Sequence, residues 1–117
     1  MRTVPLVVDG RPVATAVVAD TYLARLRGML GRAPLPEAML LVPCTSVHGM
    51  GMRTALNVAF VARGGEVLGT GVLRPYAFLG APRGTRAVLE APTGSFERWG
   101  LVTGAALALP DASPRLA

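Results

Sequence analysis

The sequence has no lysine, isoleucine or glutamine, and it has one cysteine, one histidine and few aromatic residues. Arginine, valine and alanine take the places of lysine and isoleucine, which is typical of a GC-rich genome. All twelve basic residues are therefore arginine, and with seven acidic residues the formal net charge is +5. Because aromatic residues make up only 5 % of the chain, no segment alternates basic and aromatic residues as a stacking platform for nucleic acid would.

Long hydrophobic runs are also missing. The apolar stretches at 38–42 and 56–62 are far shorter than the roughly 18 residues needed to span a bilayer. Residues 1–8 lead directly into the turn-forming pair Asp9-Gly10 and do not have the pattern of a secretory signal. The lone Cys44 has no second cysteine to pair with, which suits a reducing compartment. We therefore expect a cytoplasmic protein without a membrane span.

The composition is that of a globular domain. Of the 117 residues, 51 % are hydrophobic and 16 % are charged, which is far from the profile of a disordered chain. A chain of this length can bury roughly two thirds of its unfolded surface without disulfides or metals. We expect one domain over residues 1–110 and a frayed tail over 111–117.

Glycine-containing turns predict two antiparallel hairpins. Asp9-Gly10 readily takes the positive φ angles of a tight turn, and Gly64-Gly65 gives a similar signal. The predicted hairpins join residues 4–8 to 13–18 and residues 57–62 to 66–73. Between the hairpins, Asp20 or Thr21 can cap a short helix that Gly31 should end, with Leu23, Leu26 and Leu30 on one face.

The rest of the chain reads as short strands and loops. Further strands are predicted at 39–42, where burial on both sides is expected, and at 86–91 and 105–109, with one helical turn at 95–99. The segment 74–84, rich in proline and glycine, is predicted to be a loop whose Tyr76 and Phe78 pack onto the body. The fold class is therefore mainly β (α+β): a compact antiparallel barrel-like or sandwich domain with one short amphipathic helix near residues 21–30.

Residues able to do chemistry are concentrated at 43–53. If this segment is extended, one face carries Cys44, Ser46, His48, Met50 and Met52. Sulfur and imidazole ligands suit Cu(I), and a Cys–His pair suits nucleophilic catalysis. Residues four apart in a strand lie roughly 13 Å from each other, which opposes both interpretations. We therefore predict no metal and no cofactor.

Two further interpretations of the segment stay open. His48, Arg53 and Glu90 could converge on a pocket for a small anionic or polar ligand. Alternatively, Cys44 is a small buried apolar residue, the methionines fill core gaps, and His48 is structural. Elsewhere, Arg25, Arg27 and Arg32 form a basic helix face that could bind nucleic acid, although a solvated face is the simpler explanation.

Several short motifs, taken in order, resemble the domain of unknown function 192 (DUF192) family. They are Arg27-Gly28-Met29-Leu30-Gly31-Arg32, the run from Met39 to His48, Gly51-Met52-Arg53, Asn57-Val58-Ala59-Phe60 and the run from Val88 to Gly94. The resemblance implies a compact mainly β domain with no established activity. The family pattern falls on Gly28, Met52, Arg53 and Glu90, and the Cys44–His48 arrangement resembles a subgroup. This chain has Asn57 where the family commonly has Asp.

The leading hypothesis is non-enzymatic binding of a small polar ligand or a protein partner at a cleft. Its candidate residues are Cys44, His48, Met52, Arg53, Asn57 and Glu90. Since Asn57 carries no charge, Glu90 is the predicted ion-pair partner of Arg53. The alternative is an enzyme of unknown class that uses Cys44 and His48, with a lowered thiol pKa. The third is nucleic-acid binding through the arginine-rich helix face.

Overall fold

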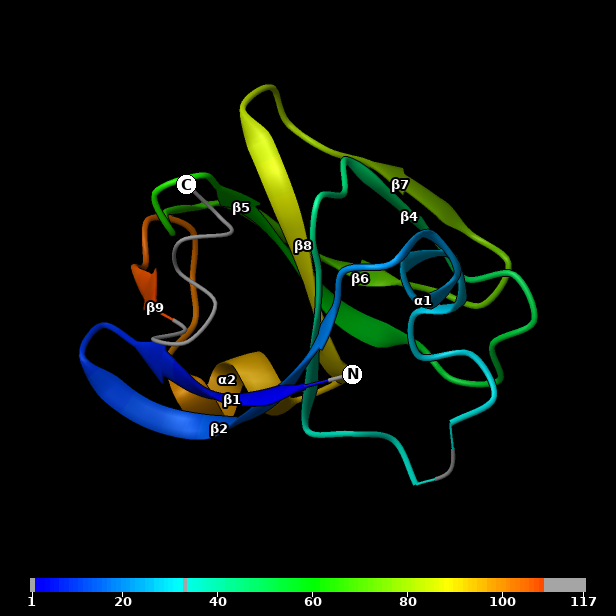
Figure 1. Cartoon of the computed structure of the whole chain (residues 1–117), viewed down its shortest axis with the longest axis horizontal. Helices are drawn as coiled ribbons and strands as arrows, with labels where there is room; N and C mark the ends of the chain where they lie inside the picture. The colour runs from blue at the N-terminus through cyan, green and yellow to red at the C-terminus, as the bar shows by residue number, and fades with distance from the viewer. Residues whose placement is uncertain (1, 33, 109–117) are drawn as a thin grey trace.

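A curled sheet of seven strands makes up most of the computed structural model (Figure 1). The structure describes residues 2–32 and 34–108, apart from the side chains of Tyr22, Leu23 and Leu26, so the tail expected at 111–117 lies outside the described residues. Across the sheet, the strands are β6 (Val67–Leu73), β5 (Leu56–Ala62), β8 (Thr85–Pro92), β3 (Ala38–Leu41), β2 (Arg11–Ala19), β1 (Thr3–Val8) and β9 (Leu107–Ala108). A separate pair consists of β4 (Ser46–His48) and β7 (Phe78–Gly80). The predicted mainly β class is confirmed.

Both predicted hairpins are present. Strands β1 and β2 pair antiparallel around Asp9 and Gly10, whose φ angles of 48° and 82° are those of a tight hairpin turn. Strands β5 and β6 pair antiparallel around Gly65, which has a φ of 98°. Local turn chemistry therefore sets the register of four of the seven strands.

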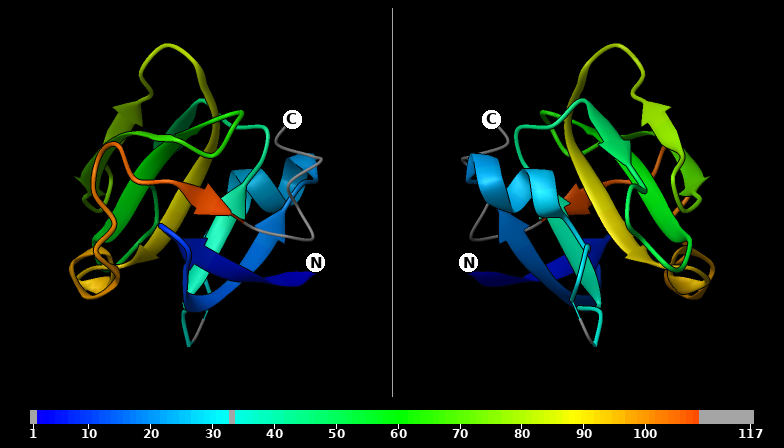
Figure 2. Two further views of the ribbon diagram at one scale, coloured as in Figure 1. Left: turned by 90° about the vertical axis from the view of Figure 1, so that its left-hand side faces the viewer. Right: turned by 90° about the vertical axis from the view of Figure 1, so that its right-hand side faces the viewer.

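One strand pair departs from the antiparallel arrangement. Strands β2 and β3 run parallel, whereas every other strand pair in the described part of the chain is antiparallel. Parallel neighbours need a connection that returns along the sheet. Here that connection carries α1 (Tyr22–Arg27), which lies against the outside of the sheet in Figure 2.

The two edges of the sheet meet at one end. An isolated bridge joins Glu66 to Ala106, the Val67 N–H donates to Ala105 O at 2.9 Å, and the Leu107 N–H donates to Gly65 O at 2.8 Å. These bonds close that end of the curl. The curl in turn gives each strand an inner and an outer face.

The inner face holds the main core. On β8, Ala87, Leu89 and Ala91 are all fully buried in it. Helix α2 (Ser95–Trp99) contributes Phe96 and Trp99 to the same cluster, with ring centroids 5.9 Å apart. As predicted, this segment is a short helix that ends at Gly100.

Two smaller apolar clusters cover the outer face. One lies under α1 and includes Met29, Met39 and Leu56. The other lies under the β4–β7 pair and includes Val47 and Val88. The outer face of β8 is thus covered by short, separate elements, as the arrangement of α1, β4 and β7 in Figure 1 shows.

Two local predictions are wrong. The helix ends at Arg27 with Gly28 as its C-cap, one turn before Gly31; the predicted leucine stripe includes Leu23 and Leu26, whose side chains lie outside the described residues. Tyr76 and Phe78 do not pack onto the body, since each is 67 % exposed. Residues 78–80 form a strand, so alternation turns Leu79 inward and Phe78 outward, while Tyr76 lies in the turn before this strand with a φ of 61°.

Candidate functional site

Glu90 is a buried carboxyl group on the outer face of β8. It pairs with Met39 on β3 and with Val58 on β5, and it is only 3 % exposed. Its Oε1 atom has no hydrogen-bond partner among the described residues. Buried polar side-chain atoms in folded proteins are nearly always hydrogen-bonded. One oxygen of the Glu90 carboxyl group is therefore left without a partner by the described part of the chain.

The end of α1 is built closely around this carboxyl group. Gly28 has a φ of 53°, which favours glycine, and its N–H donates to Ala24 O at 2.9 Å. A Cβ atom at this position would lie 2.8 Å from Glu90 Oε1. Glycine is thus needed both for the helix end and for the approach of Glu90.

Burial controls the ionisation of Glu90. Desolvation raises its pKa to about 7, while the Met29 backbone N–H and the Arg32 guanidinium act in the opposite direction and do not offset it. The Met29 backbone N–H acts on the carboxyl group as a hydrogen-bond donor, and Oε1 is the oxygen left without a partner among the described residues. Glu90 therefore changes charge near neutral pH.

A small cavity of about 20 Å³ lies beside Glu90. A volume of roughly 10–15 Å³ is enough to hold one water molecule. The cavity is lined by α1 and its C-terminal turn, by β3, β4 and β5, and by the β4–β5 turn; the lining includes Arg25, Arg27, Gly28, Met29, Leu30, His48, Met50, Met52 and Glu90. Of the predicted site residues, His48, Met52 and Glu90 are thus brought together.

A turn after His48 makes this possible. Strand β4 ends at His48, and the Met52 N–H donates to Gly49 O at 3.1 Å. A Cβ at Gly49 would lie only 2.3 Å from Arg74 O, so the close crossing of these two loops requires glycine. The Nδ1 atom of His48 accepts a hydrogen bond from the Met50 N–H at 3.3 Å. The segment is therefore extended only as far as His48 and bends after it, so the single face considered for an extended segment does not run on to Met52.

A larger groove of about 550 Å³ adjoins the cavity. The two share Met29, Leu30 and Met52 as lining residues. The turn after α1 forms one wall of the groove and residues 51–54 form the other; the lining is Met29, Leu30, Gly31, Arg32, Pro34, Leu35, Gly51, Met52, Arg53 and Thr54. It is mostly apolar, with an arginine on each wall.

The two groove arginines differ in how they are held. Arg32 Nε donates to Gly28 O at 2.7 Å. Arg53 is exposed and has no hydrogen bond or ion pair in the part of the chain that the structure describes. The predicted ion pair of Arg53 with Glu90 is likewise absent from the described residues, and the guanidinium that acts on the pKa of Glu90 is that of Arg32. Arg53 thus remains available to a ligand.

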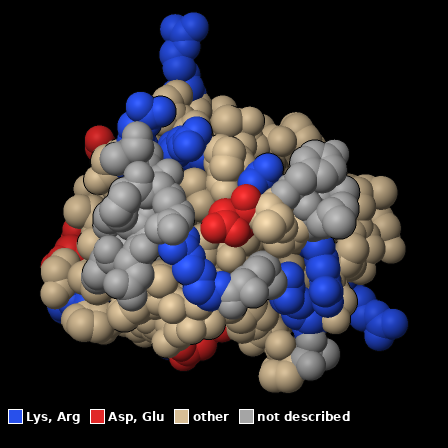
Figure 3. All heavy atoms as spheres, in the orientation of Figure 1, with Lys and Arg blue, Asp and Glu red and all other residues tan. Residues whose placement is uncertain are grey.

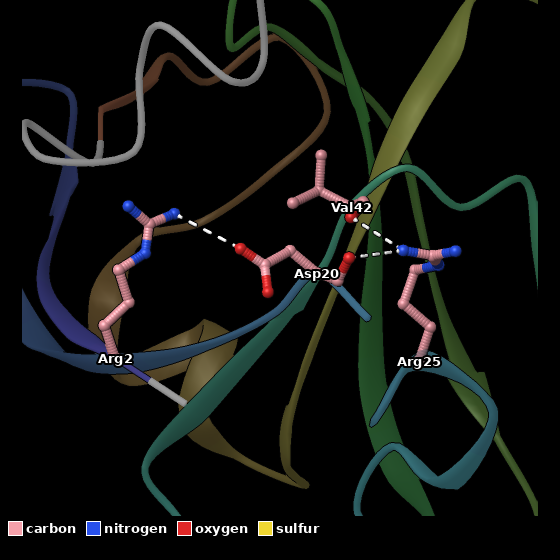
Figure 4. A network of polar contacts seen from close by, with 4 residues as sticks. All are labelled: Arg2, Asp20, Arg25 and Val42. Atoms are coloured by element: carbon pink, nitrogen blue, oxygen red, sulfur yellow. Dashed lines mark hydrogen bonds and ion pairs between the residues drawn. The ribbon is translucent and has the colours of Figure 1, made fainter. Parts of the chain in front are cut away.

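Other arginines of the helix region bond to backbone carbonyls. Arg25 Nη1 donates to Asp20 O at 2.7 Å and to Val42 O at 3.4 Å, so it ties α1 to the ends of β2 and β3 (Figure 4). Arg27 Nε donates to Leu30 O at 2.8 Å. On the face seen in Figure 3, basic side chains form separate groups with acidic atoms between them. Arg25 and Arg27 therefore stabilise the fold through these hydrogen bonds.

Cys44 does not form a nucleophilic pair with His48. Its Sγ donates to Ser46 O at 3.0 Å, and within the described ranges no hydrogen bond joins it to His48. Burial raises the pKa of the thiol, the opposite of what an activated nucleophile needs. The side chain packs against both outer apolar clusters. Its geometry is that of a partly buried apolar residue.

Asn57 belongs to the other side of the sheet. It pairs with Ala91 on β8, while its neighbour Val58 pairs with Glu90, so alternation places Asn57 on the inner face. Its Oδ1 accepts a hydrogen bond from the Phe96 N–H at 3.2 Å. Gly94, the N-cap of α2, makes no side-chain cap bond. Asn57 therefore completes the first turn of α2.

Sequence reasoning missed the part played by the turn after α1. Met29 and Arg32 line the groove and influence Glu90, yet neither was a candidate for the cleft, and Arg32 was considered only for a nucleic-acid-binding face. A signal was present, because both lie in one of the motifs that carry the family resemblance.

Among the described residues, no three His, Cys, Asp or Glu side chains are grouped to hold a metal ion. None of the described helices is long and apolar enough to cross a bilayer.

Comparison with known proteins adds a family and a fold. The DUF192 family model, described as an uncharacterized ACR, matches residues 5–109. A UPF0127 protein of Pyrococcus furiosus is 31 % identical over 91 residues, which cover 74 % of this chain and 78 % of the relative.

Two solved structures share the architecture. A protein of unknown function from Novosphingobium aromaticivorans has a TM-score of 0.76 and 23 % identity, covering 91 % of this chain and 84 % of that one. A protein of Sinorhizobium meliloti, described as a candidate transcription regulator, has a TM-score of 0.77 and 20 % identity, covering 92 % of each chain. At these identities the similarity shows the fold alone.

Proposed function

The chain belongs to the DUF192 family, a family of unknown function, and we propose that it binds a small ligand with an apolar body and a carboxylate without transforming it. The ligand would lie in the groove between the turn after α1 and residues 51–54. The observation that carries the proposal is Arg53, an arginine without a partner among the described residues, at the wall of a mostly apolar groove.

The shape and chemistry of the groove support a small molecule. Its volume of about 550 Å³ lies in the range of roughly 300–1,000 Å³ typical of ligand sites, which combine apolar walls with a few polar groups. The apolar part of a ligand would contact Met29, Leu35 and Met52. A guanidinium can pair with a carboxylate through two parallel hydrogen bonds, so Arg53 can fix both the position and the orientation of this group.

The proposal is tested by titrating the full chain with straight-chain carboxylates from acetate to octanoate while recording amide NMR spectra. We expect shifts at residues 29–35 and 51–54 that grow with chain length, since a longer chain buries more apolar surface. The alcohols of the same length should bind more weakly, because they lack the charge that Arg53 recognises.

Two variants make the test specific. Arg53→Gln should weaken carboxylate binding about tenfold, the effect of losing roughly 1.4 kcal/mol. Arg63→Gln removes the same charge from the β5–β6 turn, outside the groove, and should leave binding unchanged. Equal weakening by both variants, or the absence of shifts at the groove, would contradict the proposal.

The reactivity of Cys44 separates this proposal from the enzyme alternative. Because burial raises the thiol pKa above its ordinary value of 9.0, alkylation by iodoacetamide should reach half its maximal rate only above that pH. His48→Ala should not change the midpoint. A midpoint near neutral pH that moves in His48→Ala would instead support a Cys44–His48 pair.

A further inference from the structure

The Glu90 carboxyl group has a free oxygen that the fold itself does not use. Oε1 is buried and has no hydrogen-bond partner among the described residues, although Glu90 is only 3 % exposed. A carboxyl group kept for structural reasons would have its oxygens hydrogen-bonded. Gly28, the C-cap of α1, lies beside this oxygen and offers it no side chain. No described residue supplies the missing partner, which leaves Oε1 open to a group from outside the chain.

Space for such a partner lies beside the carboxyl group. The cavity of about 20 Å³ at Glu90 has room for one water-sized group. Met29, Leu30 and Met52 line this cavity and also the groove of about 550 Å³. Methionine side chains adjust readily because they are unbranched and have three rotatable bonds. A ligand in the groove can therefore reach the cavity by moving side chains alone.

We propose that Glu90 is a second recognition group of the ligand site, and that its Oε1 accepts a hydrogen bond from a hydroxyl group of the ligand. The inference rests on the proposed function, in which Arg53 binds the carboxylate of the same ligand. The ligand class is then a hydroxycarboxylic acid with an apolar segment between its two polar groups. The hydroxyl group fills the cavity, and the apolar segment lies along Met29 and Met52.

Surrounding charges favour a neutral hydroxyl group over an ammonium group. Arg25 and Arg27 line the cavity, and the Arg32 guanidinium acts on Glu90 electrostatically. A further positive charge would be repelled by these three arginines. A hydroxyl group donates one hydrogen bond without adding charge, and its size matches that of a single water molecule.

The test compares three series of probes on the full chain by amide NMR titration. The series are the straight-chain carboxylates, their ω-hydroxy derivatives and their ω-amino derivatives, at each chain length from two carbons upward. A hydrogen bond to a charged acceptor contributes more than one between two neutral groups. We therefore expect one chain length at which the ω-hydroxy probe binds about tenfold more tightly than its parent carboxylate.

Variants assign that gain to Glu90. Glu90→Leu removes the acceptor and should abolish the gain, while leaving the parent carboxylate bound at Arg53. Glu97→Gln changes an exposed acid on α2 and should keep the gain. Should Glu90→Leu fail to fold, Glu90→Gln gives the same comparison, with a gain reduced several-fold.

The outcomes distinguish this inference from the function it rests on. If parent carboxylates bind at the groove but the hydroxyl group adds nothing, or its gain persists in Glu90→Leu, the role of Glu90 is overturned and the proposed function stands. A gain from the ω-amino series in place of the ω-hydroxy series also overturns it. If no carboxylate binds and Arg53→Gln has no effect, the proposed function itself fails.

Discussion

The two faces of strand β8 differ in how completely their groups are satisfied. On the inner face, Ala87, Leu89 and Ala91 are fully buried in the main core, which helix α2 and most of the sheet share. On the outer face, Glu90 lies between two small apolar clusters with an oxygen that has no partner in the described part of the chain. Departures from complete satisfaction are expected at functional sites. We infer that the inner face stabilises the domain and the outer face binds.

The largest effect is expected for a cavity on the inner face. Leu89→Ala should lower the free energy of unfolding by roughly 3–4 kcal/mol, because Leu89 is fully buried in the main core. Urea unfolding measures this loss, and Val72→Ala, at a site 50 % exposed, is the control with little change. The folded fraction of Leu89→Ala should still bind carboxylates. If Leu89→Ala lowers the free energy of unfolding only weakly, the contrast between a stabilising inner face and a binding outer face of β8 is contradicted.

The second effect is the pH dependence that Glu90 imposes. Its pKa is about 7 in the folded protein and 4.5 ordinarily, so the folded state binds more protons than the unfolded state between these values. The free energy of unfolding should therefore fall as pH rises through this window, by roughly 3 kcal/mol if other groups titrate alike. The stability that protonated Glu90 contributes should be fully present below its unfolded-state pKa and fully lost above its folded-state pKa.

Glu90→Gln isolates that contribution. Urea unfolding of both proteins at about pH 4, 6 and 8 should give curves whose difference follows the titration of a single carboxyl group. The variant should be the more stable protein at the highest pH, since it has no buried charge. Parallel pH profiles for the two proteins would mean that Glu90 is satisfied, and the contrast between the faces would disappear.

An intermediate effect is expected at the helix end beside Glu90. Gly28→Ala should destabilise the protein by about 2 kcal/mol, since a positive φ is strained for alanine and its Cβ would meet Glu90 Oε1. Gly104→Ala is the matched control, because Gly104 also has a positive φ but open space around it. Adding Glu90→Ala should recover part of the loss in Gly28→Ala and none in Gly104→Ala.

The smallest effect sharpens the assignment of Asn57. Asn57→Ala should cost about 1 kcal/mol in urea unfolding, because the Phe96 N–H loses its acceptor. Asn57→Asp should be close to neutral, since a carboxylate accepts the same bond near a helix N-terminus. Neither variant should alter carboxylate binding, because Asn57 lies on the inner face. If Asn57→Ala or Asn57→Asp binds carboxylates more weakly, the inner face of the sheet also influences the binding site.

Much of the fold could be predicted because its signals are local. Asp9-Gly10 and the glycines before Glu66 specify hairpins through a few dihedral angles, and the motifs identify the family. The parallel pairing of β2 with β3 could not be predicted, since it depends on a long connection that no local signal describes. Tyr76 and Phe78 were misplaced because the β4–β7 pair forms between segments distant in sequence.

The candidate site was predicted as a set of residues rather than as an arrangement. His48, Met52 and Glu90 do share a cavity, and a lone acid within the apolar run at 87–91 was a usable sign of an unusual position. The position of Asn57 could not be foreseen, because both faces of β5 are apolar and alternation does not say which element covers each. The predicted ion pair of Arg53 with Glu90 was wrong, because the turn after α1 places the Arg32 guanidinium near Glu90 instead.

The parallel pairing of β2 and β3 has a consequence for how such a domain can diversify. The connection between these strands cannot be a tight turn, so the topology itself guarantees a long excursion over the outer face. That excursion supplies one wall of the groove, and near its end the Glu37 carboxylate accepts a hydrogen bond from the Thr15 N–H on β2 at 2.9 Å. Gly28, Met29 and Glu37 are constrained by Glu90, by the outer apolar cluster and by β2, so the positions left free to vary lie between them along the groove. Exchanges at those positions would alter the ligand that we propose the groove selects, while the sheet stays the same.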